Sequence, residues 1–178
     1  MVDLEPYINW DKCELLNAAK KGTCKELLKQ GPRDQEGIVV ESDADEQLLI
    51  TIAFQGKVKI HSLSITSGAG AQAPKEVMLF TGQVRNFDDT DATADQSLDL
   101  ESEQLGQRLE LRFVKFQQVE TLTIFIKSNQ DDEDTTILSG IKLWGVWSEA
   151  NRPAAMLIPL TARGSVPSAQ ARHSRAPT

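Results

Sequence analysis

The chain has 178 residues, of which 40% are apolar, and a formal net charge of −7. This length and apolar content suffice for one hydrophobic core, and a second domain of ordinary size would leave too little chain for the first. The negative charge argues against nucleic acid and anionic membranes as partners, because both attract clustered Lys and Arg. The sequence contains no stretch of about 18 apolar residues to span a bilayer, and the acidic Asp3 and Glu5 stand where a secretory signal has basic residues. We therefore expect a soluble protein of the cytoplasm or the nucleus.

Two short helices are the first predicted elements. The segment Asp11–Ala18 groups its apolar residues on roughly one side, as in an amphipathic helix. Thr23 and Glu26 have the spacing of a capping box, in which each side chain bonds an amide at the start of a helix. Gly31-Pro32 then predicts the end of that second helix.

Strands are predicted after the helices, because apolar residues then recur at every second position. The pattern is clearest at Leu122, Ile124 and Ile126, which alternate with polar residues. The predicted strands are Gly37–Ser42, Gln47–Phe54, Lys57–Thr66, Glu76–Gln83, Arg108–Gln117, Thr121–Lys127 and Thr136–Trp147. None of the connections has the pattern of a crossover helix, which favours antiparallel pairing. The predicted fold class is therefore all-β, an antiparallel β-sandwich with short N-terminal helices.

Two of these strands change phase along their length. Val58 and Ile60 occupy even positions, whereas Leu63 and Ile65 occupy odd ones. The apolar positions of the predicted strand Arg108–Gln117 shift in the same way. A β-bulge, or a strand that passes from one sheet to the other, produces such a shift. Both features are usual in sandwiches of two sheets.

The end of the chain differs in composition from the rest. Residues 150–178 contain four arginines, four prolines and no acidic residue. Such a segment, rich in Pro, Ala and Ser, buries too little apolar area to offset the entropy of ordering. We predict a domain of residues 1–149 followed by a basic tail, residues 150–178, that is disordered unless it binds a partner. Within the tail, Met156–Leu160 is apolar enough to dock on one.

Few residues of the kinds used in catalysis or metal binding are present. Cys13 and Cys24 are either a redox pair or, as we favour, reduced cysteines that pack as small apolar residues. Two histidines are too few for a zinc site or a Ser-His-Asp triad, so His61 is interpreted as structural. Gly68–Ala73 imitates a dinucleotide-binding loop, but Pro74 and a strand follow where a helix is required. We predict no cofactor and no enzymatic activity.

Acidic residues form three runs in predicted loops. They are Asp43, Asp45 and Glu46; then Asp88, Asp89 and Asp91; then Asp131, Asp132, Glu133 and Asp134. Carboxylates are ligands that calcium prefers, but none of the runs has the spacing of an EF-hand. Solvated loops that keep strand edges soluble are the favoured interpretation, and Asp43 and Asp45 are also able to cap turns.

Four segments carry a family resemblance. They are Tyr7–Trp10, Glu41–Ile50, Arg112–Gln117 and Leu122–Ile126. Together they resemble the PITH domain, the proteasome-interacting thioredoxin C-terminal domain, over about residues 2–146. The resemblance implies a jelly-roll β-sandwich of the galactose-binding-like class, and a module that attaches a thioredoxin domain to the proteasome. No Cys-x-x-Cys motif precedes these segments, so the chain is similar to free-standing members of the family.

The expected function is therefore non-catalytic binding of another protein, namely the proteasome regulatory particle or a comparable large assembly. The candidate partner-binding residues are Asp43, Asp45, Glu46, Met156, Leu157, Ile158 and Leu160. One alternative is carbohydrate or small-ligand binding at a loop end of the sandwich, where tryptophans could stack on a sugar, although tryptophans there are more often packing residues. Another is a structural subunit of a cytoskeletal or ciliary assembly.

Overall fold

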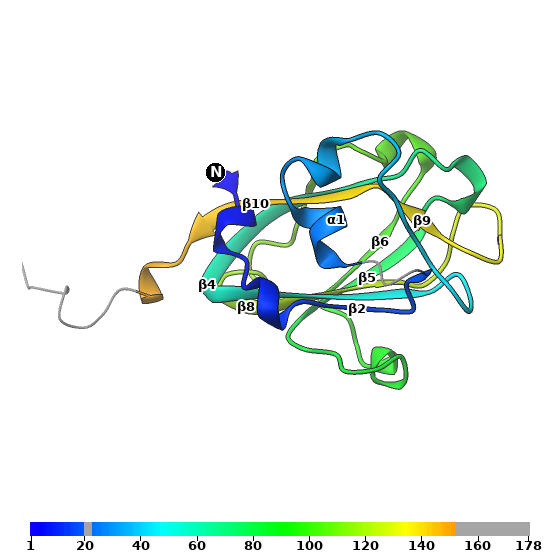
Figure 1. Ribbon diagram of the computed structural model, residues 1–178. Helices are drawn as coiled ribbons and strands as arrows, with labels where there is room; N and C mark the ends of the chain where they lie inside the picture. The colour runs from blue at the N-terminus through cyan, green and yellow to red at the C-terminus, as the bar shows by residue number, and fades with distance from the viewer. Residues whose placement is uncertain (20–22, 152–178) are drawn as a thin grey trace, which may run out of the picture.

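A single bent strand, β4 (Leu48–Thr66), takes part in both layers of the fold (Figure 1). The computed structural model describes residues 1–19 and 23–151. The first half of β4 pairs with β8 (Val119–Ile126), and the second half pairs with β10 (Gly140–Trp147). The two strands predicted on either side of Gln55-Gly56 are thus one continuous strand that turns from one layer into the other.

The layers on the two halves of β4 are built only from antiparallel pairs. The first layer contains β2 (Glu14–Leu16), β4, β8, β5 (Glu76–Thr81) and β6 (Gln96–Asp99). The second contains β1 (Val2–Asp3), β10, β4 and β7 (Leu109–Glu110). A separate small sheet pairs β3 (Val40–Glu41) with β9 (Ile137–Leu138). The antiparallel β-sandwich predicted from the sequence is confirmed.

Helical structure is short throughout the described residues. The α-helix α1 spans Cys24–Leu28. The 3-10 helices are η1 (Glu5–Tyr7), η2 (Trp10–Lys12), η4 (Pro32–Asp34), η5 (Gly70–Gln72), η6 (Asp88–Asp91), η7 (Ser102–Gln104) and η8 (Glu149–Asn151). Among the described residues, no helix is long and apolar enough to cross a membrane.

The main core lies between the two layers. Ile124 and Ile126 of β8 are fully buried in it, as the alternation predicted, together with Ile50 and Ile52 of β4. A smaller apolar cluster lies on the other face of the first layer, where Leu49, Phe80 and Phe125 pack against Val84. Both faces of β8 are therefore covered, which explains why Phe125 is also only 3% exposed.

The predicted change of phase in β4 is a bulge at His61. Gly145 of β10 pairs with Ile60 and Trp144 pairs with Ser62, so His61 is an extra residue in the ladder. Gly145 is required at this point, because a Cβ atom there would lie 1.9 Å from the Lys59 carbonyl oxygen. The bulge places the odd-numbered apolar residues that follow His61 in the core.

The second predicted change of phase is wrong, because the strand does not extend that far. β7 ends at Glu110, and the chain then turns, with the Lys115 N–H donating to the Arg112 carbonyl at 3.0 Å. Phe113 and Val114 are 53% and 84% exposed, so the apolar pattern here does not mark a buried strand face.

The first predicted helix is also wrong. Asp11–Ala18 contains one turn of 3-10 helix, η2, and then β2, which pairs along the edge of β4 with Glu14 opposite Thr51. Asn17, with φ of 64°, then turns the chain away from this edge. A free strand edge offers backbone hydrogen bonds that override a short helical pattern.

The second predicted helix is confirmed as α1. The Glu26 carboxylate accepts hydrogen bonds from the Thr23 N–H and the Thr23 hydroxyl, both at 2.5 Å. Gly31, with φ of 93°, follows the helix in the left-handed region that glycine favours.

Some predicted strands are longer than the observed ones, and two observed strands were not predicted. Gly37–Ser42 contributes only the two residues of β3, and Thr136–Trp147 divides into β9 and β10. The short strands β1 and β6 were missed, because two to four residues are too few to show alternation.

Candidate functional site

Two of the three acidic runs meet at the end of the sandwich that lies opposite the N-terminus (Figure 1). They meet because the start of β4 at Leu48 pairs with the end of β8 at Ile126, so the flanking loops lie side by side. The five acidic residues that line the resulting hollow, of about 370 Å³, are Asp45, Glu46, Asp132, Glu133 and Asp134. We call these five residues the acidic surface. Asp43 belongs to the same loop as Asp45 but is not part of the lining.

The Asn17 side chain fixes the first loop of the acidic surface. Its amide nitrogen donates to Asp45 Oδ1 and to the Gln47 carbonyl, both at 2.7 Å, and its oxygen accepts the Ala44 N–H at 3.0 Å. Asp45 Oδ1 also accepts the Gln47 N–H at 3.1 Å, which confirms that Asp45 caps a turn. The Asp43 N–H donates to the Asn17 carbonyl at 2.9 Å.

Buried polar residues fix the second loop and join it to the first. Asn129, only 1% exposed, donates to the Glu133 carbonyl at 2.7 Å and accepts the Glu133 N–H at 2.8 Å. The Thr136 hydroxyl donates to the Glu46 carbonyl at 2.6 Å, which ties the two loops together. Sequence reasoning missed Asn17, Asn129 and Thr136, because nothing in a single sequence distinguishes these residues from ordinary loop residues.

The acidic surface concentrates negative charge around one hollow. Within residues 1–19 and 23–151, no three His, Cys, Asp or Glu side chains are grouped so as to hold a metal ion. The remaining acidic run, Asp88, Asp89 and Asp91, is exposed on η6 and does not line this hollow.

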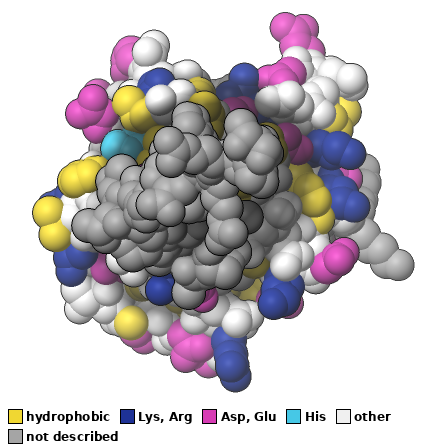
Figure 2. Space-filling model, turned by 90° about the vertical axis from the view of Figure 1, so that its left-hand side faces the viewer, with side chains coloured by type: hydrophobic (Ala, Val, Ile, Leu, Met, Phe, Trp, Pro, Cys, Tyr) yellow, Lys and Arg dark blue, Asp and Glu magenta, His cyan; other side chains and the backbone are white. Residues whose placement is uncertain are grey.

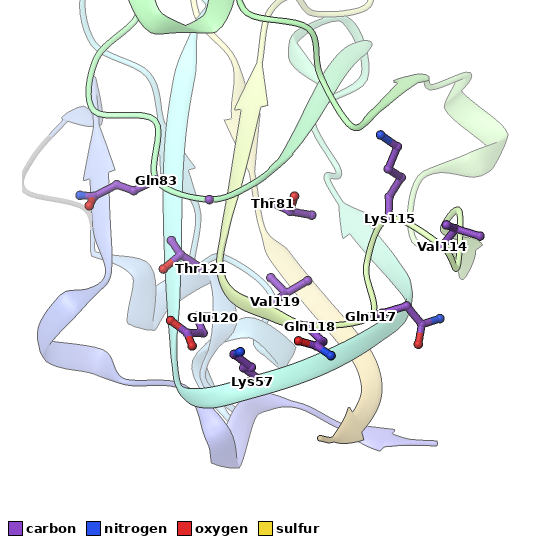
Figure 3. A pocket seen from close by; sticks show the side chains of 11 residues that line it. Lys57, Thr81, Gln83, Val114, Lys115, Gln117, Gln118, Val119, Glu120 and Thr121 are labelled. Atoms are coloured by element: carbon purple, nitrogen blue, oxygen red, sulfur yellow. The ribbon is translucent and has the colours of Figure 1, made fainter. Parts of the chain in front are cut away.

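A second hollow, of about 600 Å³, lies near the bend of β4 (Figure 3). It is lined by Lys57, Thr81, Gly82, Gln83, Val114, Lys115, Gln117, Gln118, Val119, Glu120 and Thr121. Amide, hydroxyl and charged groups predominate, and none of these lining residues is aromatic. The hollow can offer hydrogen bonds to a polar ligand but no ring for it to stack on.

The three tryptophans pack against the protein, as the sequence reading favoured. Trp147 stacks on Tyr7 with ring centroids 5.0 Å apart, and both residues pack against the main core, as does Trp10. The Arg108 guanidinium lies 4.8 Å from the ring centroid of Trp144.

The last described residue, Asn151, lies at the end of the sandwich that contains the bend of β4. The Asn151 side chain accepts the Lys57 N–H at 2.7 Å and donates to the Lys57 carbonyl at 2.5 Å, so the residue completes the bend of β4. Figure 2 shows that acidic, basic and apolar side chains alternate around the rim of this end. The predicted docking residues Met156, Leu157, Ile158 and Leu160 lie outside the described residues.

The remaining candidates are the two cysteines, His61 and the glycine-rich loop. Cys24 is buried, and Cys13 is partly buried against the core. The ring of His61 packs on that of Phe113, with centroids 5.3 Å apart. The glycine-rich loop contains only the 3-10 turn η5 before β5, so no helix follows that could hold a pyrophosphate.

Comparison with known proteins identifies a family and a fold. The PITH domain profile matches residues 1–161. The chain is 39% identical over 150 residues to thioredoxin-like protein 1 of Schizosaccharomyces pombe, covering 80% of this chain and 50% of that protein. It is 32% identical over 148 residues to PITH domain-containing protein 1 of Homo sapiens, covering 82% of this chain and 70% of that protein. The chain thus spans half the length of the first relative.

Solved structures with low sequence identity share the fold. CBM32-5 from Clostridium perfringens, solved in complex with GalNAc-β-1,3-galactose, has a TM-score of 0.58 at 12% identity, covering 81% of this chain and all of that one. CBM32-3 from the same organism has a TM-score of 0.54 at 14% identity, covering 79% and 96%. At these identities the likeness establishes a galactose-binding-like β-sandwich and nothing about ligands.

Proposed function

Because the chain belongs to the PITH domain family, we propose that it is a non-catalytic module that binds the proteasome regulatory particle or a comparable large assembly. The observation that carries the proposal is the convergence of two acidic runs on one fixed surface. A partner of this kind would place the protein in the cytoplasm or the nucleus.

The charge of the acidic surface defines the chemistry of the partner. Five carboxylates around one hollow favour a protein surface rich in Lys and Arg. The loops that carry them are held by Asn17, Asn129 and Thr136, so binding would order little additional chain. Such a contact forms quickly at low salt and weakens as salt screens the charges.

Neutralising the acidic surface should weaken capture of the partner. We expect the triple variant Glu46→Gln, Asp132→Asn, Asp134→Asn to bind purified proteasome regulatory particle about tenfold more weakly at low salt. The matched control carries the same loss of charge on η6, as Asp88→Asn, Asp89→Asn, Asp91→Asn, and should bind like the parent chain. Surface plasmon resonance at two salt concentrations measures both. Equal loss in the two variants would assign the effect to net charge, and no loss in either would remove the acidic surface from the contact.

The apolar segment Met156–Leu160 is the second proposed contact. The match to the family profile extends through residue 161 and therefore includes Met156, Leu157, Ile158 and Leu160. An apolar contact made in addition to a charged one supplies affinity that salt does not screen.

Substituting Leu157 by Asp should reduce capture by about tenfold at high salt while the melting temperature changes by less than about 2 °C. Val166→Asp, which introduces the same charge beyond the matched residues, is the control. Truncation after Asn151 keeps the contacts with Lys57 and should leave unfolding cooperative. A truncated chain without a cooperative transition would show that the domain extends into the tail, and capture unaffected by Leu157→Asp would end the docking role.

A second candidate function is carbohydrate binding in the hollow near the β4 bend. Its polar lining favours this candidate, and the absence of an aromatic lining residue weighs against it. A glycan array probed with the full chain tests this candidate. A sugar that binds the parent chain but not the Gln118→Ala variant would support a lectin site in the hollow, and no bound sugar would end this candidate.

A further inference from the structure

Cys13 and Cys24 lie side by side along one edge of β4, although ten residues separate them in the sequence. The Cys13 sulfur lies 3.9 Å from the Ala53 carbonyl, and the Cys24 sulfur lies 4.0 Å from the Thr51 carbonyl, two residues away on the same strand. The Cys24 sulfur also donates to the carbonyl of Glu14, the residue next to Cys13, at 3.3 Å. The pairing of β2 with β4 and the start of α1 at Cys24 bring the thiols together.

The two thiols differ in exposure and acidity. Cys24 is 5% exposed, whereas Cys13 is only partly buried. The neighbouring Cys24 thiol holds the pKa of Cys13 below its ordinary value, although burial acts in the opposite direction. The neighbouring Cys13 thiol and burial raise the pKa of Cys24. Since Cys13 is the more accessible thiol, it is the one that a reagent from solvent would meet first.

Cys13 is itself partly accessible to solvent, and a hollow that neither cysteine lines opens close by. This hollow, of about 460 Å³, is lined by Lys12, which precedes Cys13, and by Thr51 and Ala53, whose carbonyls the two sulfurs contact. The exposed Lys12 brings a positive charge to this rim, which favours an anionic co-reactant.

We propose that Cys13 and Cys24 form a reversible disulfide by exchange with a low-molecular-weight disulfide such as oxidised glutathione. The Cys13 thiolate attacks one sulfur of the glutathione disulfide, a bond to Cys13 forms, and the first glutathione leaves as its thiolate. Cys24 then loses its proton and attacks the Cys13 sulfur, which releases the second glutathione. Two protein thiols are oxidised, one glutathione disulfide is reduced to two glutathione molecules, and the two thiol protons end on them.

This disulfide would join the start of β2 to the start of α1. The reaction is a modification of the chain itself, and it requires no Cys-x-x-Cys motif and no reductase activity. It is independent of the proposed partner binding, because the acidic surface lies at a different part of the fold.

The test is a thiol titration of the full reduced chain. The protein is incubated with glutathione buffers of increasing disulfide content, quenched in acid, unfolded and treated with a thiol reagent. We expect the two thiols to be lost together, the intact mass to fall by two hydrogen atoms, and dithiothreitol to restore both. Peptide mapping should recover one linked pair that contains Cys13 and Cys24.

Single variants separate the steps. Cys24→Ala should accumulate a glutathione adduct on Cys13, because no second thiol resolves it. Cys13→Ala should form a glutathione adduct on Cys24 about tenfold more slowly than Cys24→Ala forms one on Cys13. A stable glutathione adduct on the parent chain, two surviving thiols, or a disulfide between two chains on a non-reducing gel would each overturn the proposal, and these readouts need only the parent chain.

Discussion

Replacing Ile124 by alanine should lower the free energy of unfolding by about 2–5 kcal/mol. Ile124 lies in the middle of β8, fully buried, with Ile50 of β4 on one side and Leu79 of β5 on the other. The substitution removes apolar contacts and leaves a cavity, which strands hydrogen-bonded on both sides of β8 cannot close by moving. Urea denaturation followed by circular dichroism measures the loss.

Val114→Ala is the matched control, since it removes methyl groups from a side chain that is 84% exposed. We expect that variant to unfold within about 0.5 kcal/mol of the parent. If Ile124→Ala behaved like Val114→Ala, this face of β8 could not be the packed interior of the sandwich.

Replacing Asp3 by asparagine should cost about 3 kcal/mol at neutral pH. The Asp3 carboxylate pairs with the Arg33 guanidinium, whose side chain is 4% exposed. Arg33 also donates to the Leu28 carbonyl at the end of α1 at 2.9 Å, so the pair fastens the helix to β1. Without Asp3 the buried guanidinium keeps its charge but loses its hydrogen-bonded carboxylate, and only Asp34, 3.8 Å from Nε, remains as an anionic neighbour.

The effect should depend on pH in a defined direction. Burial acts to raise the pKa of Asp3, but the hydrogen bonds from Arg33 and from the Glu5 amide hold that pKa below its ordinary value of 3.8. A lowered pKa means that the stabilisation is complete above about pH 4 and is lost as the pH falls through the folded-state pKa. The parent and Asp3→Asn should therefore converge in strongly acidic buffer.

Thermal melts of both proteins from neutral to strongly acidic pH measure this convergence. Asp11→Asn, the same change on an exposed acid, is the control and should stay near the parent throughout. A gap between the parent and Asp3→Asn that stayed constant across the whole range would show that the pair with Arg33 does not depend on the ionised carboxylate.

Elements that depend on neighbouring residues were predictable. The capping box at Thr23 and Glu26 is a contact across three positions, and the alternation in β8 reports burial of every second residue. The phase change between Ile60 and Leu63 likewise located the bulge at His61, because one extra residue moves every later side chain to the other face.

Two other segments were predicted wrongly from their local patterns. Asp11–Ala18 has a helical pattern, yet the free edge of β4 makes part of it a strand. The segment Arg108–Gln117 has the apolar pattern of a strand with a change of phase between Phe113 and Val114, but the turn that follows β7 leaves these two residues in solvent. In the first segment backbone hydrogen bonds to a strand far along the chain outweigh local preference, and in the second a turn between Arg112 and Lys115 ends the strand.

The sequence by itself determined the fold class, the charge and the absence of a Cys-x-x-Cys motif, because these follow from composition, spacing and periodicity. Only the tertiary structure decided which acidic runs form one surface and that Cys13 meets Cys24. The pairing of Leu48 with Ile126 brings residues 45–46 beside 132–134, and the edge of β4 brings two distant thiols together. Such encounters depend on strand register across long stretches of chain, which a local pattern does not encode.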